Sequence, residues 1–270
     1  MANPSLTAPS PFAIQVKKFG PLIFPPIICT GAVLLIWQVL CMNPESKMPA
    51  PLVVATQSFG LLLNPFAEEG IGLQLWISLQ RVALGYALAA VVGVAIGLVI
   101  GVNIFLRRGF DPLIQVLRTI PPLAWLPIAL AIFQDGQPAA LFLIFITAIW
   151  PIVINTAVGV QQIPKDYDNV AKVLRLNGRE YLFNILIPST VPYIFTGLRI
   201  GIGLAWLAIV AAEMLASGAG GIGFYIWDAY NAGNDNSMSQ IILAVLCVGI
   251  VGLCLDRLVS YLGSLVASES

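Results

Sequence analysis

The sequence predicts an all-α integral membrane protein with six transmembrane helices, and three observations support this fold class. Hydrophobic residues make up 59% of the 270-residue chain and charged residues only 10%, against roughly 25% charged in an ordinary soluble domain. Several stretches are apolar and long enough to cross a bilayer. The basic residues also gather on one side of these stretches. A soluble fold of this size has too little polar surface to cover so much apolar side-chain area.

The chain is predicted to form one transmembrane domain, residues 21–270, after a cytoplasmic N-terminal tail, residues 1–20. The polar connections carry turn-forming residues and lie at 42–75, 103–112, 134–138, 161–189 and 217–238. The predicted spans are 22–41, 80–102, 113–133, 139–160, 190–216 and 239–260.

The first span could also be a signal peptide, because Lys17 and Lys18 precede an apolar run. That run is about twenty residues long, which is too long for a typical signal core. The residues after it, 42–45, offer no cleavage site of small residues. We therefore interpret it as an uncleaved first membrane helix.

The distribution of basic residues predicts the orientation. If the N-terminus is cytoplasmic, the opposite side holds only Lys47. This excess on one side follows the positive-inside rule and places both termini, and segment 161–189, in the cytoplasm. The cytoplasmic side then holds Lys17, Lys18, Arg107, Arg108, Lys165, Lys172, Arg175, Arg179 and Arg257.

Composition also excludes several function classes. The chain has no histidine, the usual ligand of haem, zinc and copper and the usual general base at neutral pH. Its net charge is zero, so nothing indicates a nucleic-acid partner. The cysteines show no metal-binding spacing and are interpreted as small apolar residues: Cys29, Cys41, Cys247 and Cys254.

Two spans carry small residues at every fourth position, which lets another helix approach closely. The simpler interpretation of this pattern is tight packing without a functional message. The third span differs, because Pro121, Pro122 and Pro127 should kink or break it. Broken helices are tolerated inside a membrane where protein buries them or where they line a cavity. The third span is therefore the first candidate for a transport path, with a packing kink as the alternative.

Segment 164–178 predicts a short cytoplasmic helix with an exposed apolar stripe. Pro164 suits the first helical position, and Asn177-Gly178 suits a left-handed stop. A second helix is expected over 179–187 and should end at Pro188. The stripe of Val170, Val173 and Leu174 needs a partner to cover it. The alternative is a pair of helices lying at the lipid headgroups.

This segment resembles the cytoplasmic "EAA" loop of ABC importer permeases. In that pattern Glu-Ala-Ala precedes a Gly and an Ile-x-Leu-Pro run at fixed spacing. Ala171, Ile185 and Pro188 fit the pattern, whereas Asn169, Val170, Arg175 and Ile187 depart from it. Asp168 is the acidic residue beside Asn169.

The flanking spans strengthen the resemblance, which covers about residues 75–260. Residues 119–127 are similar to the third helix of the nitrate, sulfonate, taurine and bicarbonate class of these permeases. Residues 190–200, 211–214 and 220–229 resemble its fifth helix and the outer segment that follows. Within the class, 169–178 and the run to Met214 are most similar to the cyanobacterial nitrate and nitrite permeases, with the bicarbonate permeases as the rival.

The resemblance implies the type I importer fold, a small-oxyanion substrate and a bacterial inner-membrane location. It implies a second permease copy, two ATP-hydrolysing subunits and an external substrate-binding protein as partners. The chain has no G-x-x-x-x-G-K-[ST] loop, so it is expected to be no enzyme and to hold no cofactor, with ATP and Mg²⁺ bound by the partners.

The resemblance also implies two sets of site residues. The set that couples to the ATPase is Asp168, Asn169, Val170, Ala171, Val173, Leu174, Arg175 and Gly178. The set for the path and gate is Arg118, Thr119, Pro121, Pro122, Trp125, Asn155, Arg199 and Glu213.

Arg118 and Arg199 have a simpler alternative, snorkelling to the headgroups from near the cytoplasmic helix ends. Glu213 lies near the outer end of its span, where a carboxylate is costly. We expect it to orient a partner or to accept hydrogen bonds from the Gly-rich stretch 217–223, and so to help hold an outer gate.

Two other function classes remain open. A secondary transporter would need no ATPase, but such folds usually show two related halves, and no convincing repeat is present. A structural subunit of a membrane complex is disfavoured by the lack of histidine and by the exposed helix.

Overall fold

The computed structural model describes residues 11–43, 48–66, 70–215 and 220–268; for 11–23, Leu62, Asp168 and 267–268 it describes the backbone alone. Within these ranges the chain is helical and forms no strand. The α-helices are α1 (Pro11–Leu40), α2 (Pro51–Leu63), α3 (Ile71–Val102), α4 (Ile104–Leu117), α5 (Leu126–Phe133), α6 (Gly136–Gln161), α7 (Lys165–Val173), α8 (Gly178–Tyr181), α9 (Ile187–Leu215), α10 (Ile222–Ala232) and α11 (Ser237–Ser268). A 3₁₀ turn, η1 (Pro122–Trp125), and a π turn, η2 (Leu182–Leu186), complete the order.

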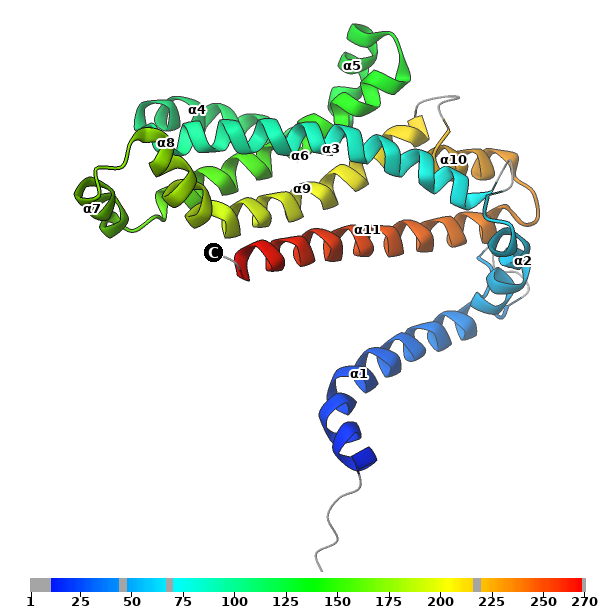
Figure 1. The fold of residues 1–270 in the computed structure, drawn as a ribbon. Coiled ribbons are helices and arrows are strands. Elements are labelled where there is room, and N and C mark those ends of the chain that lie inside the picture. The colour runs from blue at the N-terminus through cyan, green and yellow to red at the C-terminus, as the bar shows by residue number, and fades with distance from the viewer. Residues whose placement is uncertain (1–10, 44–47, 67–69, 216–219, 269–270) are drawn as a thin grey trace, which may run out of the picture.

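The long helices α3, α6, α9 and α11 run side by side and form the bundle (Figure 1). α6 lies at its centre and packs most extensively against α3 and α9. Its side chains Leu143, Ile144 and Ile152 are fully buried. α7 protrudes at one end of the bundle, α10 and α2 lie at the other, and α1 leads away from it (Figure 1).

The predicted spans correspond to helices, but not all to straight ones. Among the described residues, four helices are long and apolar enough to cross a membrane: Ile71–Val102, Gly136–Gln161, Gly178–Leu215 and Ser237–Val266. The pair Ile104–Leu117 and Pro122–Phe133, bent by 94°, meets the same criteria only when both helices are counted as one span. The predicted first span corresponds to a shorter apolar helix, Phe24–Leu40. The predicted break of the third span is therefore confirmed at Pro121-Pro122, whereas the described residues contain four long straight spans rather than six.

Three connections were assigned as polar segments but contain helix. Residues 42–75 hold α2 and the start of α3, and 217–238 hold α10. α4 begins at Ile104 rather than at 113, because the Asn103 side chain accepts hydrogen bonds from the backbone N–H groups of Phe105 and Leu106 at 2.9 and 3.2 Å. The first turns of α3 carry the polar side chains Gln74 and Ser78, which form hydrogen bonds inside the fold. Their polarity obscured the start of this span in the sequence.

The small residues of α3 face α6, as the packing interpretation predicted. A Cβ on Gly97 would lie 2.6 Å from Cβ of Thr156, and one on Gly101 would lie 2.6 Å from Cβ of Val160. The stripe therefore lets the two backbones approach closely.

The expected stop at Pro188 was wrong, because Gly178–Leu215 forms one continuous helix. A proline inside a helix leaves the carbonyl four residues earlier without its N–H partner. The π turn η2 lies directly before this proline, and the N–H of Ile187 donates to Leu182 O, five residues back. The wider turn lets the helix pass the proline without ending.

Candidate functional site

The predicted coupling helix forms and presents its apolar stripe. α7 begins after Pro164, one residue later than expected, and the side chains of Val173 and Leu174 are 82% and 63% exposed. Val170 is also exposed, whereas Ala171 is buried. An apolar stripe on a protruding helix is the kind of surface that a partner covers.

The turn after α7 differs from the prediction. The left-handed residue is Arg175, with φ of 53°, and not Asn177 or Gly178. Asn177 instead begins α8 with a capping box: its side chain accepts from Glu180 N at 2.9 Å, and its own N–H donates to the Glu180 carboxylate at 2.8 Å. The motif was therefore a helix start, because asparagine and glutamate three positions apart satisfy two free N–H groups.

The other coupling residues lie on or beside α7. Asn169 is exposed, and Gly178 has open space where a side chain would lie. The side chain of Asp168 lies outside the described residues.

The double proline breaks the third span as predicted. α4 ends at Leu117, and Pro121 has extended backbone (ψ of 135°) before η1 begins at Pro122. The break partly satisfies its own carbonyls, since Val116 and Leu117 accept from Thr119 and Ile120 at 3.2 and 3.3 Å. These two carbonyls are therefore partnered by tight turns within the break.

A cavity of about 260 Å³ lies inside this bend; we call it the bend cavity. Three predicted path residues, Arg118, Pro122 and Trp125, line it together with residues of α6 and α9. The Trp125 ring meets Phe142 of α6 edge-on, with centroids 6.4 Å apart. The full lining is Arg118, Ile120, Pro122, Trp125, Ile146, Thr147, Trp150, Pro151, Ile154 and Leu204.

The remaining path residues lie outside the lining. Thr119 is exposed and donates its hydroxyl to Val116 O at 2.7 Å, and Pro121 is exposed at the start of the bend. Asn155 is half-buried on α6, where its side-chain amide donates to Pro151 O at 2.8 Å. Two of the predicted path residues, Arg199 and Glu213, are engaged elsewhere in carboxylate–guanidinium pairs.

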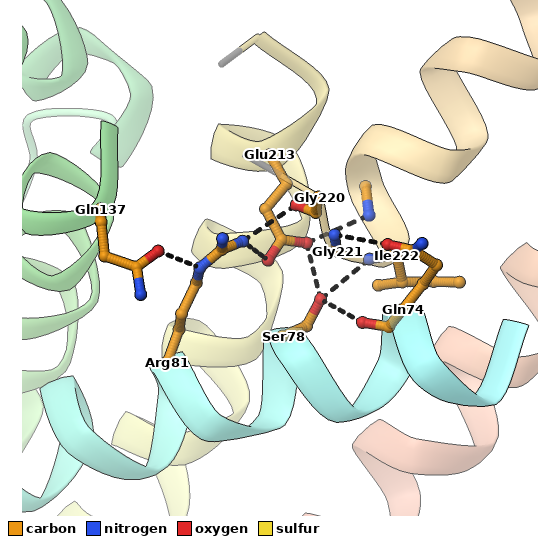
Figure 2. A network of polar contacts seen from close by, with 9 residues as sticks. Gln74, Ser78, Arg81, Gln137, Glu213, Gly220, Gly221 and Ile222 are labelled. Carbon is orange, nitrogen blue, oxygen red and sulfur yellow. Dashed lines mark hydrogen bonds and ion pairs between the residues drawn. The ribbon is translucent and has the colours of Figure 1, made fainter. Parts of the chain in front are cut away.

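Glu213 lies at the centre of a buried polar network, which we call the outer clamp: Gln74, Ser78, Arg81, Gln137, Glu213 and the backbone of 220–223 (Figure 2). Arg81 donates to one Glu213 oxygen at 2.7 Å, and Ser78 donates to the other at 2.7 Å. The Gly223 N–H also donates to the second oxygen, at 3.1 Å. The prediction that Glu213 accepts from the Gly-rich stretch is thus confirmed at Gly223.

The outer clamp joins four helices. Arg81 of α3 also donates to Gln137 of α6 at 3.1 Å and to Gly220 O at 2.9 Å. The side chains of Arg81 and Glu213 are only 5% and 1% exposed. A buried ion pair is stable only when its remaining donors and acceptors are satisfied, and here Gln74 and Ser78 also accept the N–H groups of Gly221 and Ile222. The clamp thus holds α9 and the start of α10 against α3.

Arg81 and Ser78 were missed as functional candidates. Neither residue is among the predicted coupling or path residues. Their signal was present, since Ser78 and Arg81 are three positions apart and lie on one helix face. The partner, Glu213, is 132 residues away from Arg81 and no local pattern links the two.

Arg199 pairs with Asp256 of α11 through two hydrogen bonds, at 2.6 and 2.8 Å. Both side chains are partly exposed, at 52% and 30%. This is a bidentate pair between two spans, and Arg199 lies apart from the bend cavity lining.

Comparison with known proteins extends these observations. A family described as binding-protein-dependent transport system inner membrane component matches residues 93–267. The nitrate import permease protein NrtB of Synechococcus elongatus is 58% identical, over 95% of this chain and 94% of its own. The bicarbonate transport system permease protein CmpB of the same organism is 52% identical, over 85% of this chain and 84% of its own.

A solved structure supports the fold alone. The MetNI methionine ABC transporter in an inward-facing conformation contains a chain that is 19% identical, with a TM-score of 0.56. The match covers 71% of this chain and 95% of that one. The helical arrangement is therefore that of a known importer permease.

Proposed function

The chain belongs to the family of inner membrane components of binding-protein-dependent transport systems, and we propose that it carries nitrate, and nitrite, inward across the bacterial plasma membrane. The observation that supports this most is the 58% identity to a nitrate import permease over nearly the whole length of both chains. Membership of this family decides against the secondary-transporter alternative.

The exposed stripe on α7 suits contact with an ATP-hydrolysing subunit. We propose that ATP and Mg²⁺ bind only in such partner subunits, and that α7 transmits their closure to the bundle. α7 leads through α8 and η2 into α9, and α9 packs against α6 and against η1 of the bend, so a shift of α7 can reach the path through α9. In this proposal the termini and α7 lie in the cytoplasm.

The path itself is proposed to run past the bend, between two copies of the chain. The bend cavity opens at the broken span, and irregular backbone at membrane depth is expected where it lines a path. The outer clamp lies toward the opposite end of the bundle from α7, at the side where an external binding protein would deliver its substrate (Figure 1). It would hold the outer gate.

Bicarbonate is the second candidate, because a bicarbonate permease is nearly as similar, at 52% identity. Nitrate and bicarbonate are both planar monoanions, so one path chemistry serves either. An external binding protein would select between them before the ion reaches this chain.

Uptake by the reconstituted complex tests the function. The permease, its co-purified ATPase subunits and its binding protein would be placed in vesicles with ATP inside. Uptake of ¹⁵N-nitrate that requires ATP and is not blocked by excess bicarbonate is expected. Uptake of ¹⁴C-bicarbonate without nitrate uptake would replace nitrate with the second candidate, and uptake without ATP would overturn the importer proposal.

A further inference from the structure

We infer that the bend cavity is an anion site in which the Arg118 guanidinium binds the transported ion and selects planar oxyanions. This rests on the proposed function, because it assigns the contact that the transported ion makes on its way. It goes further in placing part of the selectivity in the permease rather than in the binding protein alone.

The bend cavity lies beside the middle of a neighbouring span. Thr147, Trp150 and Pro151 of the lining lie in the middle third of α6, which crosses from Gly136 to Gln161. Arg118 ends α4, but the bend brings it beside the middle of a neighbouring span rather than to a membrane surface. A charged side chain at that depth is costly unless it faces water or a charged partner. The simple snorkelling explanation therefore does not fit Arg118.

Arg118 differs from two other arginines of the spans in its partners. Arg81 and Arg199 also lie in spans, and each donates to a carboxylate. Arg118 is exposed, and its guanidinium makes no ion pair or hydrogen bond with another residue in the part of the chain that the structure describes. The Arg118 guanidinium is therefore free to attract a mobile anion.

The walls of the bend cavity are mostly apolar around the one arginine. Arg118 is its only charged residue, and the Thr147 hydroxyl hydrogen is already donated to Leu143 O at 2.6 Å. The walls are otherwise apolar or aromatic, so they do not screen the positive charge, and a low-dielectric wall concentrates its field. At roughly 30 Å³ for each water, a cavity of about 260 Å³ has room for a small anion with several waters.

The shape of the donor gives the class of ligand. A guanidinium is a planar fork that binds two coplanar oxygens at once, which an ammonium cannot do. Nitrate and bicarbonate, carried by the two relatives, both offer that planar arrangement. Because Arg118 is exposed, the bound ion stays partly hydrated and can leave, as conduction requires.

The first experiment compares uptake by three variants of the reconstituted complex. Arg118→Gln removes the charge, and Arg118→Lys keeps the charge without the fork. Arg108→Gln is the matched control, because Arg108 is exposed on the same helix and does not line the cavity. We expect Arg118→Gln to lower nitrate uptake by about tenfold or more, the factor that corresponds to losing a hydrogen bond to a charged group. Arg118→Lys should be intermediate and Arg108→Gln unchanged.

A second experiment separates charge from structure. In a chain whose own cysteines are replaced by serine, Arg118→Cys would be modified with methanethiosulfonate reagents of opposite charge. The cationic ethyltrimethylammonium reagent should restore part of the uptake, the anionic ethylsulfonate reagent should abolish the remainder, and nitrate should slow both modifications. A residue with a purely structural role would respond alike to both reagents.

The outcomes distinguish this inference from the function itself. If the unmodified complex takes up bicarbonate instead of nitrate, the same variants are tested with bicarbonate. Equal bicarbonate uptake by Arg118→Gln and the unmodified complex would then contradict the inference. If the unmodified complex takes up nitrate and Arg118→Gln does so equally well, the inference is wrong while the function holds. Equal effects of the two reagents would also overturn it.

Discussion

At the scale of single residues, the Arg81–Glu213 pair shows how the fold accommodates charge inside an apolar bundle. Glu213 accepts from Arg81, Ser78 and Gly223, so both of its oxygens are occupied. The Glu213 carboxylate also occupies the space where a Cβ on Gly221 would lie, and Val210 O does so at Gly223. Glycine is required at both positions because Gly221 lies directly against the carboxylate and Gly223 lies directly against the Val210 carbonyl.

Removing one charge of this pair should destabilise the protein more than removing both charges. Glu213→Leu leaves the Arg81 charge buried and unpaired, and the expected loss of stability is on the order of 3–5 kcal/mol. The double variant Glu213→Leu with Arg81→Met removes both charges and should recover much of that loss. The measurement is the half-life of the folded permease in detergent at raised temperature. If the double variant proved less stable than Glu213→Leu alone, the buried-charge explanation would fail.

At the scale of elements, α7 is helical and amphipathic but protrudes from the bundle (Figure 1). Its amino-acid pattern predicted the stripe correctly, since periodicity is a local property. The end of the helix was misassigned because Asn177-Gly178 suits a left-handed stop and a helix start equally well, and the capping box with Glu180 decides for the start.

Charged substitutions on α7 should release the ATPase subunits. Burial of Val173 and Leu174 against a partner would stabilise the contact by roughly 1.5–3 kcal/mol for each side chain. The double variant Val173→Glu with Leu174→Lys should therefore remain in the membrane but lose the co-purifying ATPase. Lys172→Gln, exposed on the same helix, is the control and should retain it. Normal co-purification of the double variant would contradict the assigned contact.

The bend between α4 and α5 is the second element with a direct consequence for transport. Replacing Pro121 and Pro122 with alanine restores two backbone donors and should straighten the span through the bend cavity. We expect uptake to fall by about tenfold or more, equivalent to roughly 1.4 kcal/mol in the barrier, while assembly and basal ATP hydrolysis persist. Pro112→Ala, inside α4 and away from the lining, is the control. Uptake and ATPase activity would be measured on one preparation, and wild-type uptake by the double variant would leave the prolines a packing role only.

At the scale of the whole molecule, one copy leaves much apolar surface uncovered. α1 leads away from the bundle, and its side chains Ile27, Val33 and Val39 are all more than half exposed (Figure 1). Lipid covers such a surface in a membrane, and so can a second copy. The proposed pair of permeases would place two bend cavities beside one path.

The amino-acid sequence alone was enough to predict the membrane class, the approximate positions of the four long spans and the break at Pro121-Pro122. These depend on composition, on helical periodicity and on proline stereochemistry, all of which act over a few neighbouring residues. The boundaries were less certain where polar residues opened a helix, as at the start of α3. The span was predicted to begin at residue 80, whereas α3 begins at Ile71 and carries the polar residues Gln74 and Ser78 in its first turns.

Which arginine is paired and which is left open could not be predicted from the sequence. Glu213 meets Arg81 across 132 residues, and Asp256 meets Arg199 across 57. Arg118 instead reaches the middle of α6 through the bend. The local sequence does not distinguish these three arginines, because each is a basic residue in or near an apolar run. Their different environments arise from the packing of distant helices, which places a carboxylate beside two of them and a cavity beside the third.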